Sequence, residues 1–174
     1  GFSVVKYAGS QGSNFTVGHG LSSPKLAFVK SLSATDSWGV YYNITGTNTN
    51  WMQLNDTPAV GTNNSDPDAN GVASGAGGYN GYYAIFNAST MSVSSSAFAN
   101  GGTSVIGYFF QEVNGFSKIG SYVGNGDADG TFIYTGFKPA FVIIKVTSRT
   151  DQYWQIKDVK RDTYGQVLGE YNST

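Results

Sequence analysis

The segment Thr103–Val113, TSVIGYFFQEV, has the pattern of a long β-strand. Side chains of a strand point alternately to the two faces of a sheet. One face therefore takes Val105, Gly107, Phe109 and Gln111, and the other takes Ile106, Tyr108, Phe110 and Glu112. Shorter runs of this kind recur about every ten residues along the chain, as in all-β proteins. No segment keeps the 3.6-residue period of an amphipathic helix.

The remaining predicted strands are bounded by glycine, proline and asparagine turns. They are 3–8, 14–17, 25–31, 38–43, 51–54, 117–123, 131–135, 140–147 and 153–158. The run Phe141–Ile144 does not alternate, which predicts a strand covered on both faces. Many short strands between glycine-rich turns predict an all-β fold, an antiparallel sandwich of the jelly-roll or concanavalin type.

The sequence also repeats itself. Gly1-Phe2-Ser3 returns as Gly115-Phe116-Ser117, and residues that follow the first copy recur in order behind the second. The matched pairs are Tyr7 with Tyr122, Gly9 with Gly124, Gly20 with Gly136, Pro24 with Pro139, Lys30 with Lys145, Ser33 with Ser148 and Trp38 with Trp154. A duplicated unit explains this order. We expect a first unit at 1–114 and a second, incomplete unit at 115–174 packed against it, in a fragment of a longer chain.

Composition excludes several classes of protein. Lys and Arg number 10 against 11 Asp and Glu, so no basic surface for nucleic acid is predicted. No apolar run is long enough for a membrane-spanning helix, which needs about 18 residues. The chain has no cysteine and so neither disulfides nor thiolate metal sites.

The middle of the chain, residues 55–87, differs in composition and includes the glycine-rich stretch Gly75–Tyr83. Loops of this length inside a domain are usually functional or disordered. Tyrosine offers a large contact area at low entropic cost, so Tyr79, Tyr82 and Tyr83 are candidate binding residues together with Trp51. The alternative is that 82–86 form one more strand with tyrosines packed on the sandwich.

Two segments have the opening spacing of a calcium-binding loop. One contains Asp66, Asp68 and Asn70, and the other contains Asn125, Asp127 and Asp129. The twelfth position of both loops is glycine, where the calcium-binding pattern has a bidentate glutamate. Asp-Gly turns between strands are the ordinary alternative, so the cofactor expected is none, with Ca²⁺ as the one candidate.

Catalytic residues are not predicted. His19 is the only histidine, and its Gly-His-Gly context predicts a turn residue. Glu112 and Glu170 are the only glutamates, which leaves little from which to build a glycosidase acid and base. We expect a protein without enzymatic activity.

Several motifs carry a resemblance to a known family. They are Gly1–Tyr7, Thr16–Leu21, Pro24–Lys25, Phe28–Lys30, Gly115–Lys118, Gly120–Tyr122, Gly124–Gly126, Asp129–Gly130, Phe132, Tyr134–Val142 and Lys160–Asp162. Together they resemble a domain of unknown function in large virion proteins of marine tailed phages. Those proteins are often labelled tail-fibre or structural proteins and often have concanavalin-like sandwich domains as neighbours. The stretch Gly75–Tyr83 departs from the family pattern.

The resemblance implies a structural virion part in a tail fibre or other appendage, assembled in the host cytoplasm and then extracellular. Its expected partners are other virion proteins or copies of itself, as in a homotrimer, with host attachment through a surface glycan as a further role. Alternatives are a lectin-like carbohydrate-binding module, a capsid decoration protein and a glycan-degrading enzyme. An exposed aromatic platform would favour the lectin, and two facing carboxylates in a cleft would favour the enzyme.

Overall fold

A computed structural model of the chain describes residues 1–10, 15–43, 50–55, 84–93 and 104–160. All regular elements in these ranges are strands paired antiparallel. They are β1 (Phe2–Tyr7), β2 (Phe15–Gly18), β3 (Pro24–Ser31), β4 (Gly39–Tyr42), β5 (Asn50–Gln53), β6 (Ala84–Phe86), β7 (Thr90–Val93), β8 (Val105–Gln111), β9 (Phe141–Ile144) and β10 (Gln155–Asp158). The predicted all-β class is confirmed.

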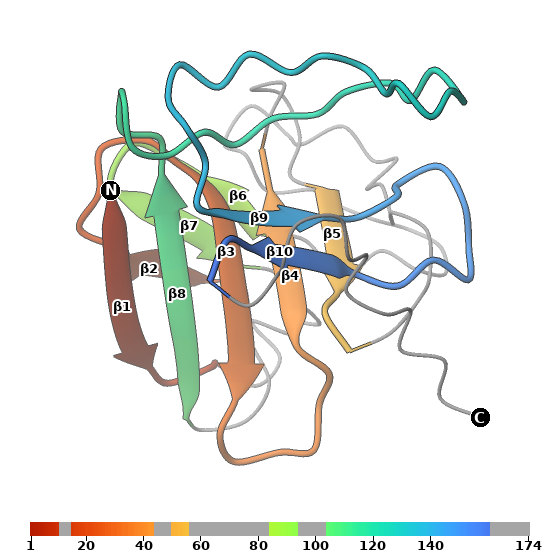
Figure 1. Cartoon of the computed structure of the whole chain (residues 1–174). Coiled ribbons are helices and arrows are strands. Elements are labelled where there is room, and N and C mark those ends of the chain that lie inside the picture. Colours follow the sequence, from red (N-terminus) through yellow and green to blue (C-terminus); the bar gives the residue numbers. More distant parts are fainter. Residues whose placement is uncertain (11–14, 44–49, 56–83, 94–103, 161–174) are drawn as a thin grey trace.

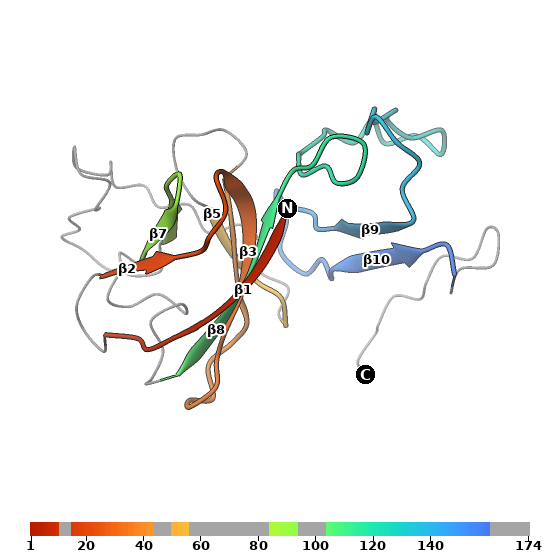
Figure 2. The same ribbon diagram turned by 90° about the vertical axis from the view of Figure 1, so that its left-hand side faces the viewer.

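The strands form three layers (Figures 1 and 2). A five-stranded sheet with the order β1-β8-β3-β4-β5 lies in the middle. A three-stranded sheet, β2-β7-β6, faces one side of it, and the β9–β10 hairpin lies on the other side.

The main core fills the space between the two larger sheets. The five-stranded sheet contributes Ala27, Val29, Tyr41 and Phe109, and the three-stranded sheet contributes Val17, Phe86, Met91 and Val93. Burying one such side chain stabilises the fold by roughly 1.5–3 kcal/mol. The alternation predicted for Thr103–Val113 places Phe109 in this core, and the strand itself is central.

The other face of the five-stranded sheet is also apolar. Phe110 contacts Phe2 at a ring separation of 4.9 Å and Phe28 at 5.6 Å. Val40 and Met52, which pair across β4 and β5, are buried although they point away from the main core. The indole Nε1 of Trp154 donates to the carbonyl of Gln53 at 2.9 Å, so the segment that carries β10 is attached to this face.

Some sequence predictions are wrong. Residues 117–123 and 131–135 are not strands, because a strand forms only where a neighbour satisfies its backbone groups, and neither segment is paired in a sheet within the described ranges. Strand β7 was not predicted. Phe141 and Val142 are 53% and 37% exposed, so β9 is not covered on both faces. The strand predicted at 82–86 is confirmed for Ala84–Phe86.

Candidate functional site

His19 is a structural residue. Its imidazole is fully buried, 5.4 Å from the ring of Phe109. The Leu21 N–H donates to Nδ1 at 3.1 Å, and Nε2 lies 3.2 Å from the Asn87 carbonyl. A carbonyl only accepts, so Nε2 carries the proton. The sequence predicts His19 as a plain turn residue. It does not predict that the side chain, directly after β2, is buried in the core.

Glu112 joins the end of β8 to β3 and to the segment that follows. Its carboxylate accepts from Lys25 Nζ at 2.9 Å and from the Ile119 N–H at 3.0 Å, and it lies 3.3 Å from Lys118 Nζ. Burial raises the pKa of Glu112, but the Ile119 N–H and the two ammonium groups outweigh it and lower the pKa to about 2. A general acid needs the opposite shift, so this carboxylate is suited to holding the junction together.

The predicted calcium-loop residues Asn125, Asp127 and Asp129 lie in an exposed loop. The Asp127 N–H donates to Asn125 Oδ1 at 3.1 Å, and the Asp129 N–H donates to Asp127 Oδ1 at 3.1 Å. These bonds are those of successive polar turns. Within the described ranges, no three His, Cys, Asp or Glu residues gather as metal ligands would. Calcium binding here stays a prediction.

Among the predicted binding residues, Trp51 is half-buried and packs against the main core. Tyr79, Tyr82 and Tyr83 lie outside the described residues, as do Asp66, Asp68 and Asn70. The predicted aromatic contact set therefore stays a prediction.

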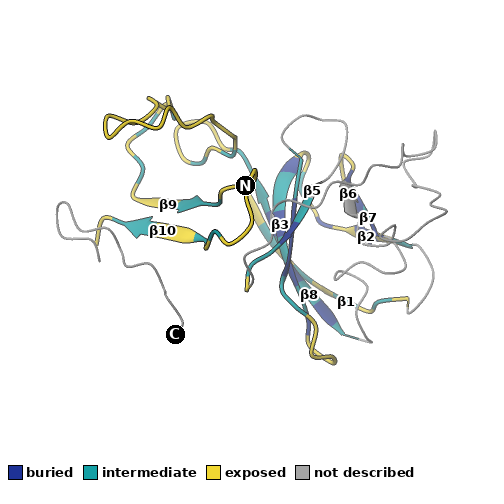
Figure 3. Cartoon of the chain, turned by 90° about the vertical axis from the view of Figure 1, so that its right-hand side faces the viewer, coloured by how far each residue is buried: buried dark blue, intermediate teal, exposed yellow. Residues whose placement is uncertain are grey.

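Residues 113–160, which follow β8, carry many exposed apolar side chains. None of residues 113–160 is buried. Figure 3 shows this segment mostly in the colours of exposed and intermediate residues. Its exposed large apolar side chains are Val113, Phe116, Tyr122, Val123, Phe132, Ile133, Tyr134, Phe141, Val142, Val146, Tyr153, Ile156 and Val159. Exposed apolar side chains that gather into a large patch mark interaction sites. The sequence pattern does not predict this exposure, because it assigns the same residues to a packed sandwich.

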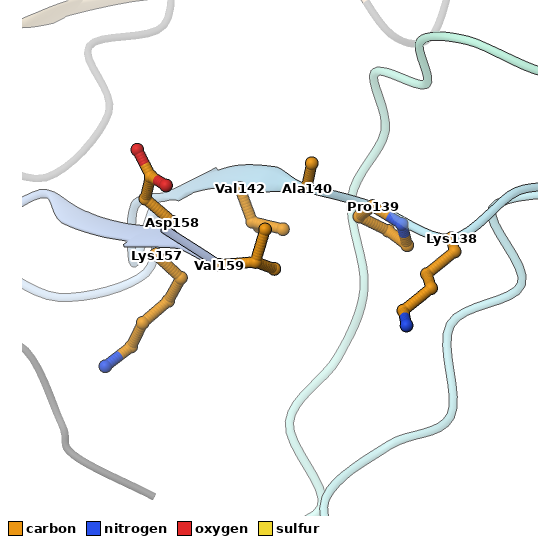
Figure 4. Close-up of a pocket in the computed structure, with 7 residues that line it drawn as sticks. All are labelled: Lys138, Pro139, Ala140, Val142, Lys157, Asp158 and Val159. Carbon is orange, nitrogen blue, oxygen red and sulfur yellow. The ribbon is translucent and has the colours of Figure 1, made fainter. Parts of the chain in front are cut away.

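A hollow of about 440 Å³ opens on one face of the β9–β10 hairpin. It is lined by Lys138, Pro139, Ala140, Val142, Lys157, Asp158 and Val159 (Figure 4). Val142 and Val159 give it an apolar wall, and the lysines and Asp158 lie around it. This lining is better suited to binding an apolar side chain of a partner than to catalysing a reaction.

Comparison with known families identifies the chain. A family described as a domain of unknown function, DUF7483, matches residues 1–173. The chain belongs to the DUF7483 family. No curated protein and no solved structure matches it. Because the DUF7483 match spans both halves, the exposed second half is part of the family domain. In the described part of this DUF7483 chain, no helix has the length and apolar character needed to cross a membrane.

Proposed function

We propose that this DUF7483 chain is a non-enzymatic structural module of a tailed-phage virion, in a tail fibre or another surface appendage. It assembles there with other virion proteins or with copies of itself, as in a homotrimer. The observation that carries the proposal is the set of exposed large apolar side chains in residues 113–160, a segment in which no residue is buried. Such a surface is costly in water and is stabilised by protein partners.

Further support comes from the titratable groups. Glu112 is held as a carboxylate by two lysines and a backbone N–H, and His19 is enclosed by Leu21, Asn87 and Phe109. His19 is fully buried and Glu112 is already paired with two lysines, so an assembly role fits them better than catalysis. The phage assignment rests on the motif resemblance, and the jelly-roll or concanavalin type of the sandwich belongs to the same proposal. Host attachment would be a further role of the appendage.

The test is to purify phage particles that encode the chain and to reconstruct them by electron microscopy, with an antibody against the chain as a label. We expect label and density on a tail appendage. Density repeated over the capsid lattice would instead identify a decoration protein. Absence from purified particles, with the chain abundant in the infected-cell lysate, would overturn the virion assignment.

A further inference from the structure

The β9–β10 hairpin has the same register as β3–β4 in the first half. In β3–β4, Leu26 pairs with Tyr42 and Val29 pairs with Gly39. In β9–β10, Phe141 pairs with Asp158 and Ile144 pairs with Gln155. The β9 residues lie 115 positions after their β3 counterparts, and the β10 residues lie 116 positions after their β4 counterparts, at all four paired positions.

Two hydrogen bonds outside the strands recur at the same offsets. Asn43 donates its N–H to the Lys25 carbonyl at 2.9 Å, and Val159 donates its N–H to the Ala140 carbonyl at 3.0 Å. The ammonium group of Lys30 donates to the Asp36 carbonyl, and that of Lys145 donates to the Gln152 carbonyl. The hairpins therefore share their strand ends and their connecting loop as well as their register.

The two hairpins differ in what lies on the second edge of the first strand. β3 pairs with β4 on one edge and with β8 on the other. β9 pairs with β10, and its other edge has no strand in the described ranges. Along an antiparallel strand, the backbone hydrogen-bonding groups of successive residues point alternately to the two neighbouring strands. The carbonyl of Ala140 accepts from Val159, so it points toward β10. The N–H and C=O groups of Phe141 and Ile143 consequently point to the open edge, as those of Leu26 and Phe28 point to β8.

Within Phe141–Ile144 this edge carries no charged residue and no proline. Edge strands are commonly protected by charged residues, proline or bulges, whereas β9 is Phe-Val-Ile-Ile. The hollow of about 440 Å³ is lined by Val142 and Lys157, which pair across the hairpin, and by Val159. Val142 is the counterpart of Ala27, and Ala27 pairs with Phe109 of β8. A strand placed as β8 is placed in the first half would therefore put an aromatic ring into the hollow.

We infer that the open edge of β9 binds one extended strand of the β8 type, antiparallel, with an aromatic side chain opposite Val142 and a small residue opposite Ile144. The small residue follows from Gly107, which pairs with Val29 beside the Phe109 ring. A partner polypeptide supplies the strand. The β8 of this chain, and of any second copy, is already held between β1 and β3. The inference deepens the proposed assembly role, on which it rests, by naming the partner's chemistry.

The probe is a synthetic peptide with the sequence of Ser104–Glu112, extended by two lysines at each end for solubility. Amide hydrogen exchange is measured by NMR on the ¹⁵N-labelled chain. In the chain alone, the amides of Phe141 and Ile143 should exchange fast, whereas those of Val142 and Ile144, which face β10, should be protected. Saturating peptide should slow exchange at Phe141 and Ile143 at least tenfold and change Val142 and Ile144 little.

Matched peptides make the test specific. N-methylation at the residue equivalent to Tyr108, which faces β3 in the chain, should abolish protection. N-methylation at the residue equivalent to Phe109, which faces away from that edge, should leave it intact. Unchanged exchange with the parent peptide would overturn the inference. So would protection of Phe141 and Ile143 that rises with chain concentration alone, because a second copy would then fill the edge. The measurement needs no virion, so its failure is distinguishable from absence of the chain from particles.

Discussion

The ammonium group of Lys25 lies 2.9 Å from a carboxylate oxygen of Glu112, although 87 positions separate the two residues in the chain. Lys25 belongs to β3, and Glu112 directly follows β8, so the pair closes one end of the central strand pair. The second carboxylate oxygen holds Lys118 and the Ile119 N–H. One side chain therefore connects the sandwich to the first residues of the exposed half.

Replacing Glu112 with Gln should make unfolding less dependent on pH in the acid range. The pKa of Glu112 falls from an ordinary 4.5 to about 2 in the folded chain. The stabilisation is therefore complete above about pH 4.5 and is lost as the pH falls toward 2. Urea unfolding at pH 7, 4 and 3 should show the wild-type losing more stability than E112Q over this range. Parallel losses in the two proteins would contradict the assignment.

Two lysine variants separate the contributions of Lys25 and Lys118 to the stabilisation by the Glu112 carboxylate. Lys25→Met removes the closer and less exposed partner, at 2.9 Å and 33% exposure, and Lys118→Met removes the one at 3.3 Å and 53% exposure. We expect the larger loss of stability at pH 7 for Lys25→Met, because exposed ion pairs contribute little.

Gly107→Ala should destabilise the central sheet by about 1–3 kcal/mol, as overpacking of a core does. A Cβ at this position would lie 2.8 Å from Cε2 of Phe109, whose side chain is fully buried, so the ring or the backbone must shift. Gly120→Ala is the control, since nothing lies within 4 Å of a Cβ there. Thermal unfolding of both variants measures the difference. Equal melting temperatures would show that Phe109 repacks freely.

His19→Phe should cost about 1–3 kcal/mol, the range for a buried polar group left without its partner. The substitution leaves the Leu21 N–H without its acceptor and the Asn87 carbonyl without the imidazole donor. Denaturant unfolding measures the change, and Tyr134→Phe at a side chain that is 79% exposed is the control. A variant as stable as the wild-type would show that the hydrogen bonds of His19 do not stabilise the fold.

The sequence pattern predicts β1 to β5 and β8, and each of these strands pairs with at least one neighbour. It misses the short strand β7. The same pattern fails at 117–123 and 131–135. Alternation specifies only that a segment can form a strand, and pairing needs a partner that the described residues do not supply. The contacts that define the site join residues far apart in the sequence, so the local pattern does not predict them either. The burial of His19 depends on Asn87 and Phe109, and the charge state of Glu112 depends on Lys25.

Trp154→Phe should weaken the attachment of the β9–β10 hairpin to the five-stranded sheet. The indole Nε1 donates to the Gln53 carbonyl, and a bond of this kind contributes about 1 kcal/mol. Gln53 ends β5 next to Met52, which is buried with Val40 on the face toward the hairpin. NMR shifts of the Val40 and Met52 methyl groups report the attachment directly, and Tyr153→Phe, at 44% exposure, is the matched control. Loss of attachment should move both signals in W154F while the Met91 methyl signal, in the main core, stays in place. If the Val40 and Met52 signals do not move, the hydrogen bond from Trp154 to Gln53 does not hold the hairpin to the sheet.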